Sequence, residues 1–158
     1  MQLGRITLMT VISSVLAFAA DPFIGTWKPI HTDTWRINPG VRDPQMLKSS
    51  SQKWEAIGID QYRTTLLTPD GKVVERDGQP VRMEVSFDGK EHKPPSGNTQ
   101  MLQRIDETHL ASNVKGPKGG YVDEWAVSAD GKTLTVTRKG TSPAKGGPMD
   151  EIQIYERQ

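Results

Sequence analysis

From Ser51 onward, apolar and polar residues alternate along the chain with a period of two. The alternation is clearest in residues 81–87, 121–127 and 133–137. Successive side chains of an extended strand point to opposite faces, so this pattern predicts strands with one buried face and one solvated face. No stretch of about ten or more residues after position 20 has the spacing of an amphipathic helix. The pattern therefore predicts an all-β protein.

Turn signals separate the alternating stretches. Asp-Gly pairs begin at Asp70, Asp77, Asp88 and Asp130. This pair tolerates the positive φ angles of tight hairpins, so each pair predicts a reversal of the chain. Asp106 and Glu107 predict another short turn. Gly- and Pro-rich connections lie at 93–98, 115–120 and 140–148.

These signals together predict an antiparallel meander, because consecutive strands joined by short turns pair with their neighbours. We expect strands near residues 23–28, 51–59, 61–68, 72–76, 80–88, 99–105, 108–114, 121–128, 132–139 and 149–156. An up-and-down meander of about eight to ten strands can close into a barrel, which removes its unpaired edges. A sandwich of two sheets is the alternative architecture.

The connection from Pro29 to Ser50 has neither an alternating pattern nor an Asp-Gly turn. Connections of this length in a compact domain are usually functional or disordered. This one contains apolar residues, among them Trp35. It is therefore either a lid packed on one mouth of the barrel or a mobile loop.

Residues 1–20 differ in kind from the rest of the chain. Arg5 is their one charged residue, an apolar run covers 6–18, and Ala17 and Ala19 precede the first acid, Asp21. These features are typical of a cleaved secretory signal peptide, and the run is shorter than the roughly 20 residues of a membrane-spanning helix. We therefore expect a single domain at 21–158, secreted or periplasmic, with no stable membrane insertion after cleavage.

Charge and cysteine content narrow the classes of function. The chain has 20 Lys+Arg and 19 Asp+Glu, and loss of Arg5 with the leader would make the two equal. Bases and acids are interleaved, so no basic surface for nucleic acid is predicted. The chain has no Cys, so the core must hold the fold without disulfides.

The two ends of the predicted domain resemble a known family. The opening Phe23-Ile24-Gly25-Thr26-Trp27-Lys28, the stretch 127–140 around Asp130-Gly131-Lys132, and the closing Ile154-Tyr155-Glu156-Arg157-Gln158 are similar to the small secreted lipocalin-like, calycin-type proteins of bacteria. The resemblance implies a lipocalin-like barrel whose narrow end is closed by Trp27 under an arginine, either Arg157 or Arg138. The Thr-Asp-Tyr turn of the lipocalins is missing, so the broader calycin-type barrel is what the resemblance implies.

The composition of the strands predicts a barrel interior that is not packed solid. Many strand positions are small or polar, namely Thr64, Thr65, Ser112, Ser128, Thr133, Thr135 and Thr137. A barrel of eight or more strands can hold one small ligand or be filled by side chains. We therefore expect a cavity for a small, largely apolar ligand, open near the 29–50 connection. The expected ligand contacts are Trp125, Tyr62, Trp35 and Tyr121.

Motifs for chemistry are weak. The histidines His31, His92 and His109 lack the spacing of a metal site, no Ser has the context of a nucleophile elbow, and no catalytic residue, metal or cofactor is predicted. Asp123 is notable because it shares a strand face with Tyr121 and Trp125. A buried acid must be paired or have a shifted pKa; alternatively, Asp123 lies at a frayed strand start beside Lys118.

Three functions remain at this point. The first is a secreted or periplasmic protein that binds a small apolar ligand inside the barrel. The second is a cell-envelope interaction module with a filled barrel. The third, less favoured, is a cofactor-free calycin-type enzyme that would use Asp123 with Tyr121 or Tyr62. The sequence predicts no oligomeric state.

Overall fold

The computed structural model describes residues 21–30, 50–93 and 97–158, and this part of the chain contains strands and no helix. Its strands are β1 (Gly25–Pro29), β2 (Ser51–Gly58), β3 (Gln61–Leu67), β4 (Glu75–Arg76), β5 (Gln79–Pro80), β6 (Arg82–Ser86), β7 (Asp88–His92), β8 (Thr99–Arg104), β9 (His109–Gly116), β10 (Gly119–Val127), β11 (Thr133–Thr141) and β12 (Pro148–Arg157). The predicted signal peptide, Trp35 and His31 lie outside the described residues. In the described ranges, no helix is long and apolar enough to cross a membrane.

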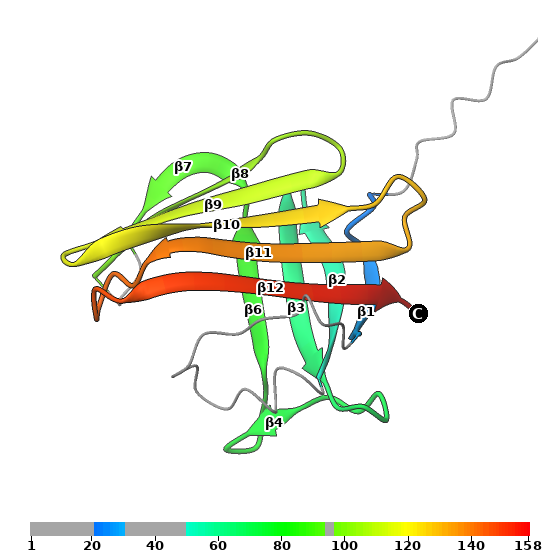
Figure 1. Ribbon diagram of the computed structural model, residues 1–158. Coiled ribbons are helices and arrows are strands. Elements are labelled where there is room, and N and C mark those ends of the chain that lie inside the picture. Colours follow the sequence, from blue (N-terminus) through cyan, green and yellow to red (C-terminus); the bar gives the residue numbers. More distant parts are fainter. Residues whose placement is uncertain (1–20, 31–49, 94–96) are drawn as a thin grey trace, which may run out of the picture.

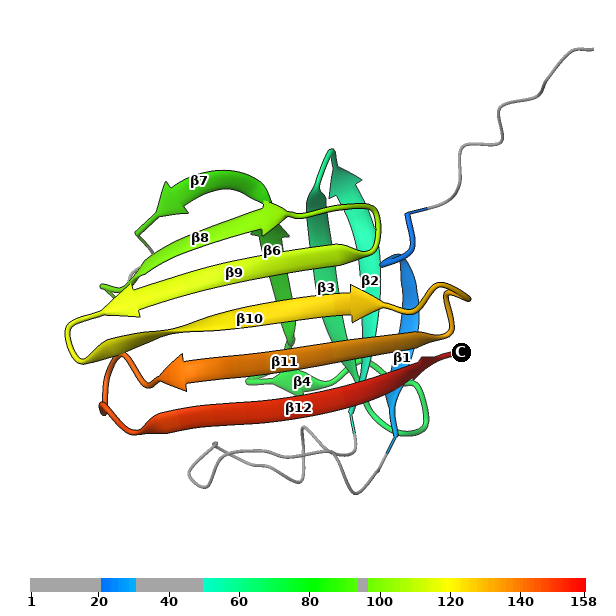
Figure 2. The same cartoon turned by 45° about the horizontal axis from the view of Figure 1, so that its top comes forward.

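Ten of the strands form one antiparallel sheet in the order β6-β3-β2-β1-β12-β11-β10-β9-β8-β7. Figures 1 and 2 show the sheet bent into two layers, with β8 to β12 on one side and β2, β3 and β6 running across them on the other. Strand β1 pairs with both β2 and β12 and so joins the beginning of the domain to its end. The predicted all-β meander bent into a barrel is therefore confirmed.

The barrel is not fully closed, because its two edge strands, β6 and β7, are not paired with each other. Strands β6 and β7 follow one another in the chain, separated by Phe87, yet lie at opposite ends of the sheet order. Phe87 is buried, and its backbone N–H donates to the carbonyl of Asp60 at 2.8 Å. We call this unpaired junction between β6 and β7 the seam.

The segment 68–92 differs most from the sequence prediction. The expected strand at 72–76 shortens to β4, which forms a separate two-stranded ribbon with β5, and the expected strand at 80–88 divides between β5 and β6. The Asp-Gly pairs at 70, 77 and 130 make turns with glycine φ angles of 83°, 72° and 70°. The predicted turn at Asp88 is wrong. Gly89, with a φ of 71°, instead lies inside β7, where the pairing with β8 shifts register between Asp88 and Glu91.

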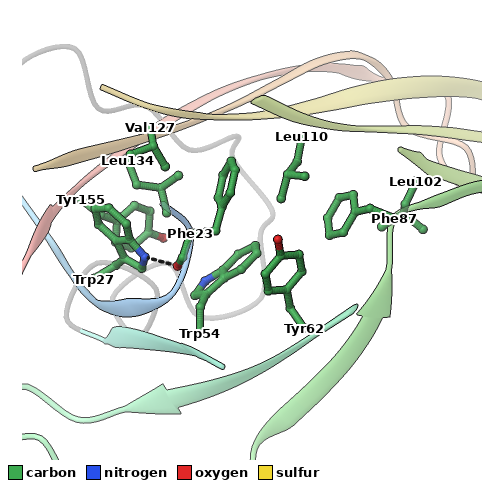
Figure 3. Packing of buried hydrophobic residues seen from close by; sticks show 10 residues of the cluster. All are labelled: Phe23, Trp27, Trp54, Tyr62, Phe87, Leu102, Leu110, Val127, Leu134 and Tyr155. Atoms are coloured by element: carbon green, nitrogen blue, oxygen red, sulfur yellow. Dashed lines mark hydrogen bonds between the residues drawn. The ribbon is translucent and has the colours of Figure 1, made fainter. Parts of the chain in front are cut away.

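Aromatic side chains dominate the buried core, which Figure 3 shows between the two layers. The cluster contains Phe23, Trp27, Trp54, Tyr62, Phe87, Leu102, Leu110, Val127, Leu134 and Tyr155. Phe23, Trp54 and Tyr62 contact one another, with ring centroids 5.6 to 6.4 Å apart. Such offset and edge contacts add about 0.5–1.5 kcal/mol per pair beyond the burial of apolar area.

The segment Asp21–Ile24 closes one end of the barrel. Phe23 is fully buried, and its carbonyl accepts a hydrogen bond of 2.9 Å from the Trp27 indole, drawn in Figure 3. Arg157 holds this segment by donating to the carbonyls of Pro22 and Ile24. Of the two arginines that the resemblance allowed, Arg157 is therefore the one at Trp27.

The position of glycine in the Gly-x-Trp sequence has a steric explanation. Gly25 has a φ of 145°, a conformation that side chains rarely adopt, and a Cβ there would lie 2.9 Å from Nη1 of Arg157. The absence of a side chain thus leaves room for the guanidinium that holds the closing segment.

Arg104 of β8 fastens the same segment from the other side. Its guanidinium donates to Asp21 at 2.8 Å and to Asp60 at 2.5 Å, and it also bonds the hydroxyl of Tyr62. The Tyr62 hydroxyl in turn donates to Asp21. Burial raises the pKa of Tyr62, and the nearby Asp21 raises it further, so the phenol stays protonated as this donor.

Candidate functional site

A cavity of about 510 Å³ lies inside the barrel beside the aromatic core. Its volume is within the range of roughly 300–1,000 Å³ that small-molecule sites occupy. The apolar part of its wall is Trp54, Met83, Val85, Phe87, Leu102, Trp125 and Val136. The polar part is Gln52, Thr64, Glu84, Gln100, Tyr121, Asp123, Arg138, Glu151 and Gln153. The cavity thus combines an apolar wall with a charged one.

The charged wall residues other than Glu84 belong to one row that runs across four neighbouring strands. Asp123 on β10 lies opposite Ser112 on β9 and opposite Arg138 on β11. Arg138 in turn lies opposite Glu151 on β12. Residues directly opposite in an antiparallel sheet share a face and contact each other. The register therefore places one acid on each side of Arg138, and all three side chains face the interior.

Arg138 and Asp123 form a two-pronged ion pair at the centre of this row. Nε of Arg138 donates to Oδ1 of Asp123 at 2.5 Å, and Nη2 donates to Oδ2 at 2.9 Å. Ser112 adds a longer hydrogen bond of 3.4 Å to Oδ2. The guanidinium also lies over the ring of Tyr121, with its carbon 4.4 Å from the centroid. Such a bidentate geometry fixes the orientation of both partners.

The pKa values of these groups show how the row is charged. Burial alone would lower the pKa of Arg138, but the hydrogen bonds and negative charge of Asp123 outweigh it, so the pKa is raised and the guanidinium keeps its proton. Burial raises the pKa of Tyr121 in spite of the nearby Arg138, so the phenol is neutral. The Arg138–Asp123 pair therefore has no net charge, and the charge of the row depends on Glu151.

Glu151 has the fewest hydrogen-bond partners among the charged residues of this row. It is 5% exposed, and Oε2 lies 3.6 Å from Nη1 of Arg138, an ion-pair distance longer than a hydrogen bond. Oε1 is buried and has no hydrogen-bond partner among the described residues. Burial raises the pKa of this carboxyl, partly offset by Arg138. An unsatisfied buried acceptor costs about 1–3 kcal/mol, and more if it is charged.

The structure places the four predicted ligand contacts differently. Trp125 and Tyr121 line the cavity on β10. Tyr62 is buried in the core with its hydroxyl engaged by Asp21 and Arg104, and it is not part of the cavity wall. Trp35 lies outside the described residues. Contact of these residues with a ligand stays a prediction.

Asp123 is not at a frayed strand start. It lies within β10, is 4% exposed and is paired with Arg138, so the alternative placement beside Lys118 is wrong. The pairing also occupies both carboxylate oxygens, which leaves Asp123 a poor general base for the enzyme hypothesis. Within residues 21–30, 50–93 and 97–158, no group of three or more His, Cys, Asp or Glu side chains could hold a metal ion.

A second hollow of about 440 Å³ adjoins the cavity at the seam. The two share Glu84 and Val85 of β6 and Gln100 and Leu102 of β8 as wall residues. Since β6 has no ladder with β7 or β8 in the described sheet, the shared wall lies where the backbone hydrogen bonding stops. The seam is therefore a side opening toward the cavity.

Comparison with known proteins rests on shape. No protein-family model matches the chain, and no curated protein matches it in sequence. Fatty-acid-binding protein 1 of Echinococcus granulosus superposes with a TM-score of 0.54 at 12% identity, over 87% of this chain and 98% of that chain. The chain therefore has the antiparallel barrel fold found in fatty-acid-binding proteins.

Two further solved structures share the fold and hold ligands. The fatty-acid-binding protein of Schistosoma mansoni, in complex with arachidonic acid, has a TM-score of 0.52 and 16% identity over 87% of this chain and 96% of that one. The zebrafish ileal bile-acid-binding protein, complexed with cholic acid, has a TM-score of 0.52 and 15% identity over 87% and 99%. Identities this low establish the fold alone, so any ligand has to be argued from the side chains of this chain.

The sequence pattern missed Arg138 and Glu151 as interior residues. The signal that could have found them is the turn at Asp130-Gly131. Positions equally distant from a hairpin turn face each other, so this turn pairs Asp123 with Arg138. The turn between β11 and β12 does the same for Arg138 and Glu151.

Proposed function

We propose that the protein binds a small, largely apolar molecule inside the barrel and carries it in the periplasm or outside the cell. The observation that supports this most directly is the cavity of about 510 Å³ between the two layers of strands. A protein that needed only a stable scaffold would gain by filling this space, because protein interiors are normally close-packed. The calycin-type fold is compatible with the proposal but does not carry it.

The aromatic wall would hold the apolar body of the ligand. Phe87 and Trp125 meet edge to face, with ring centroids 5.7 Å apart, and both line the cavity. Leu102 and Val136 extend this wall on β8 and β11. Burying apolar surface against it contributes about 25 cal/mol per Å² removed from water.

The seam would admit the ligand. Its hollow shares wall residues with the cavity, so a ligand passing between the two unpaired edges, β6 and β7, does not have to break a ladder of the described sheet. The opposite route through the end at Trp27 is closed by Asp21–Ile24 and its two arginines. The Pro29–Ser50 connection, predicted to be either a lid on one mouth of the barrel or a mobile loop, lies mostly outside the described residues.

A probe that fluoresces in apolar surroundings tests the proposal. Nile red should bind the protein with a dissociation constant of about 1 μM, which corresponds to about −8 kcal/mol. Val136→Trp fills the cavity from β11 and should abolish the fluorescence. Val122→Trp adds the same side chain to the exposed face of β10 and should leave binding intact. A parent protein that binds no probe, or equal binding by both variants, would refute the carrier function.

The other two hypotheses predict different results. An interaction module has no use for a hollow interior, so Val136→Trp would leave its partner binding unchanged. An enzyme of the proposed kind would need Asp123 free to accept a proton, whereas both of its oxygens accept hydrogen bonds from Arg138. These observations favour the carrier over its alternatives.

A further inference from the structure

Glu151 marks the position where a ligand would make its polar contact. Its Oε1 atom is buried in the cavity wall without a hydrogen-bond partner among the described residues. Buried polar atoms in folded proteins are nearly always hydrogen-bonded. An acceptor in a cavity wall without a donor from the protein is therefore a candidate to bind a ligand. An ionised carboxylate oxygen accepts hydrogen bonds, so the missing partner has to be a hydrogen-bond donor.

A carboxylate is the wrong partner for this wall. Among the described residues, Arg138 is the one base lining the cavity, and two of its nitrogen atoms already donate to Asp123. Its third nitrogen, Nη1, faces Glu151 Oε2 at 3.6 Å. A ligand carboxylate would be the third acid around a single guanidinium, and like charges that share a site disfavour one another.

A donor without negative charge meets the opposite situation. Because Arg138 and Asp123 form an ion pair, an ionised Glu151 leaves the row of Asp123, Arg138 and Glu151 with one net negative charge. An amine or a hydroxyl can donate to Oε1, and an ammonium group also cancels that charge. The apolar body would then extend toward Trp125, two residues along the same face of β10 from Asp123.

We propose that the cavity selects an amphiphile whose head group is an amine or a hydroxyl that donates to Glu151 Oε1, and that it disfavours carboxylates. The selection rests on the proposed function, since it presupposes that the cavity holds a ligand. It separates this barrel from the two similar structures above, which hold arachidonic acid and cholic acid.

Three ligands that share one alkyl chain test the selection on the unmodified full-length protein. Decylamine, decanol and decanoate are each titrated below their micellar concentrations at neutral pH, by displacement of Nile red and by calorimetry. The amine and the alcohol should each bind at least about tenfold more tightly than decanoate, because a hydrogen bond to a charged group is worth about that factor.

A matched pair of variants assigns the selection to one atom. Glu151→Gln removes the negative charge and supplies an amide donor, so it should reduce the preference for decylamine over decanoate by about tenfold or more. Glu156→Gln removes the same charge from an exposed position on the same strand and should leave the preference unchanged. Circular dichroism checks that both variants are folded.

The outcomes separate the two proposals. Decanoate that binds as tightly as the amine and the alcohol, or a preference that survives Glu151→Gln in a folded protein, overturns the head-group selection and leaves the carrier function standing. Failure of all three ligands and of Nile red to bind refutes the carrier function itself. Tighter binding of both donors with loss of the preference in Glu151→Gln supports the selection.

Discussion

Arg157 lies opposite Trp27 in the ladder between β1 and β12, and its guanidinium carbon is 4.4 Å from the centroid of the indole ring. The same guanidinium donates from Nε to the carbonyl of Gly131 at 2.6 Å and from Nη1 to that of Ile24 at 2.6 Å. One side chain thus joins the first strand, the last strand and the turn between β10 and β11. A cation over an indole face contributes about 0.5–2 kcal/mol, before these hydrogen bonds are counted.

Trp27→Ala should strongly destabilise the fold. Trp27 is fully buried and its indole N–H holds the closing segment through Phe23. Truncating a packed tryptophan typically costs about 3–5 kcal/mol, a large share of the roughly 5–15 kcal/mol available to a domain. Urea denaturation measures the loss, with Ile59→Ala, at a position 92% exposed, as the control. Equal midpoints for the two variants would contradict the closing role of Trp27.

Arg138→Met should destabilise the protein far more than Arg63→Met. Removing Arg138 leaves Asp123 and Glu151 buried without their base, and breaking a buried pair in this way costs about 3–5 kcal/mol. Arg63 makes two similar hydrogen bonds to Glu84, of 2.8 and 2.7 Å, on the exposed face of β3. Exposed pairs contribute about 0–1 kcal/mol. Similar losses in thermal denaturation would mean that the interior row is well solvated.

Trp125→Ala should weaken the binding of apolar probes without unfolding the protein. Trp125 lines the cavity and is partly buried, so truncating it to alanine enlarges the cavity and removes its edge-to-face contact with Phe87. We expect a loss of about 1–3 kcal/mol in binding, on the scale of one aromatic contact with its buried area. Probe titration together with circular dichroism checks this. Unchanged affinity would place the probe elsewhere.

Glu151 should make stability depend on pH in an unusual direction. Burial raises the pKa of Glu151 above its ordinary value, against the opposing effect of Arg138, so the folded protein holds this proton more tightly than the unfolded chain. Its stabilising contribution is complete below the unfolded value of about 4.3 and is lost as the pH rises through the raised pKa. Asp123, Arg138 and Tyr121, which face it, are present in both proteins compared below.

Glu151→Gln isolates this effect, because glutamine does not titrate. The free energy of unfolding of the variant, relative to the parent, should therefore increase between about pH 4 and pH 7. Urea denaturation at the two pH values gives the difference. A relative stability that is constant, or that falls with rising pH, would show that burial does not raise the pKa of Glu151.

Export is a prediction that the leader alone supports. The residues before Asp21 predict cleavage after Ala19 or Ala20. Intact-mass measurement of protein recovered outside the cytoplasm should therefore give a chain that begins at Ala20 or Asp21. A full-length chain retained in the membrane would contradict both the cleavage and the proposed location.

The sequence carried enough information for the ladder of strands but not for the whole barrel. The alternation in 121–127 correctly put Tyr121, Asp123 and Trp125 on one face, because the period of a strand is fixed by its backbone geometry. It could not show which acids are paired, since pairing depends on register between strands. The family resemblance allowed Arg138 as the arginine over Trp27, whereas the register places it inside the barrel opposite Asp123 and Glu151.

The region around the seam was harder to predict for a different reason. Asp88-Gly89 has the same local signature as the turns at Asp70 and Asp130, yet Gly89 produces a bulge within β7. Local preference allows both outcomes, and the burial of Phe87 in the core decides between them. Tertiary packing thus overrode the turn signal at this one pair.

The unpaired junction of β6 and β7 also bears on how fast the barrel can open to release a bound molecule. Moving these two edges apart breaks no ladder hydrogen bond of the ten-stranded sheet, whereas separating β10 from β11 would break a whole ladder. Opening at the junction therefore belongs to the fast motions of loops and edges, and not to the slow global unfolding of the domain. The lifetime of a bound molecule should accordingly be insensitive to substitutions such as Trp27→Ala that change only how long the barrel itself survives.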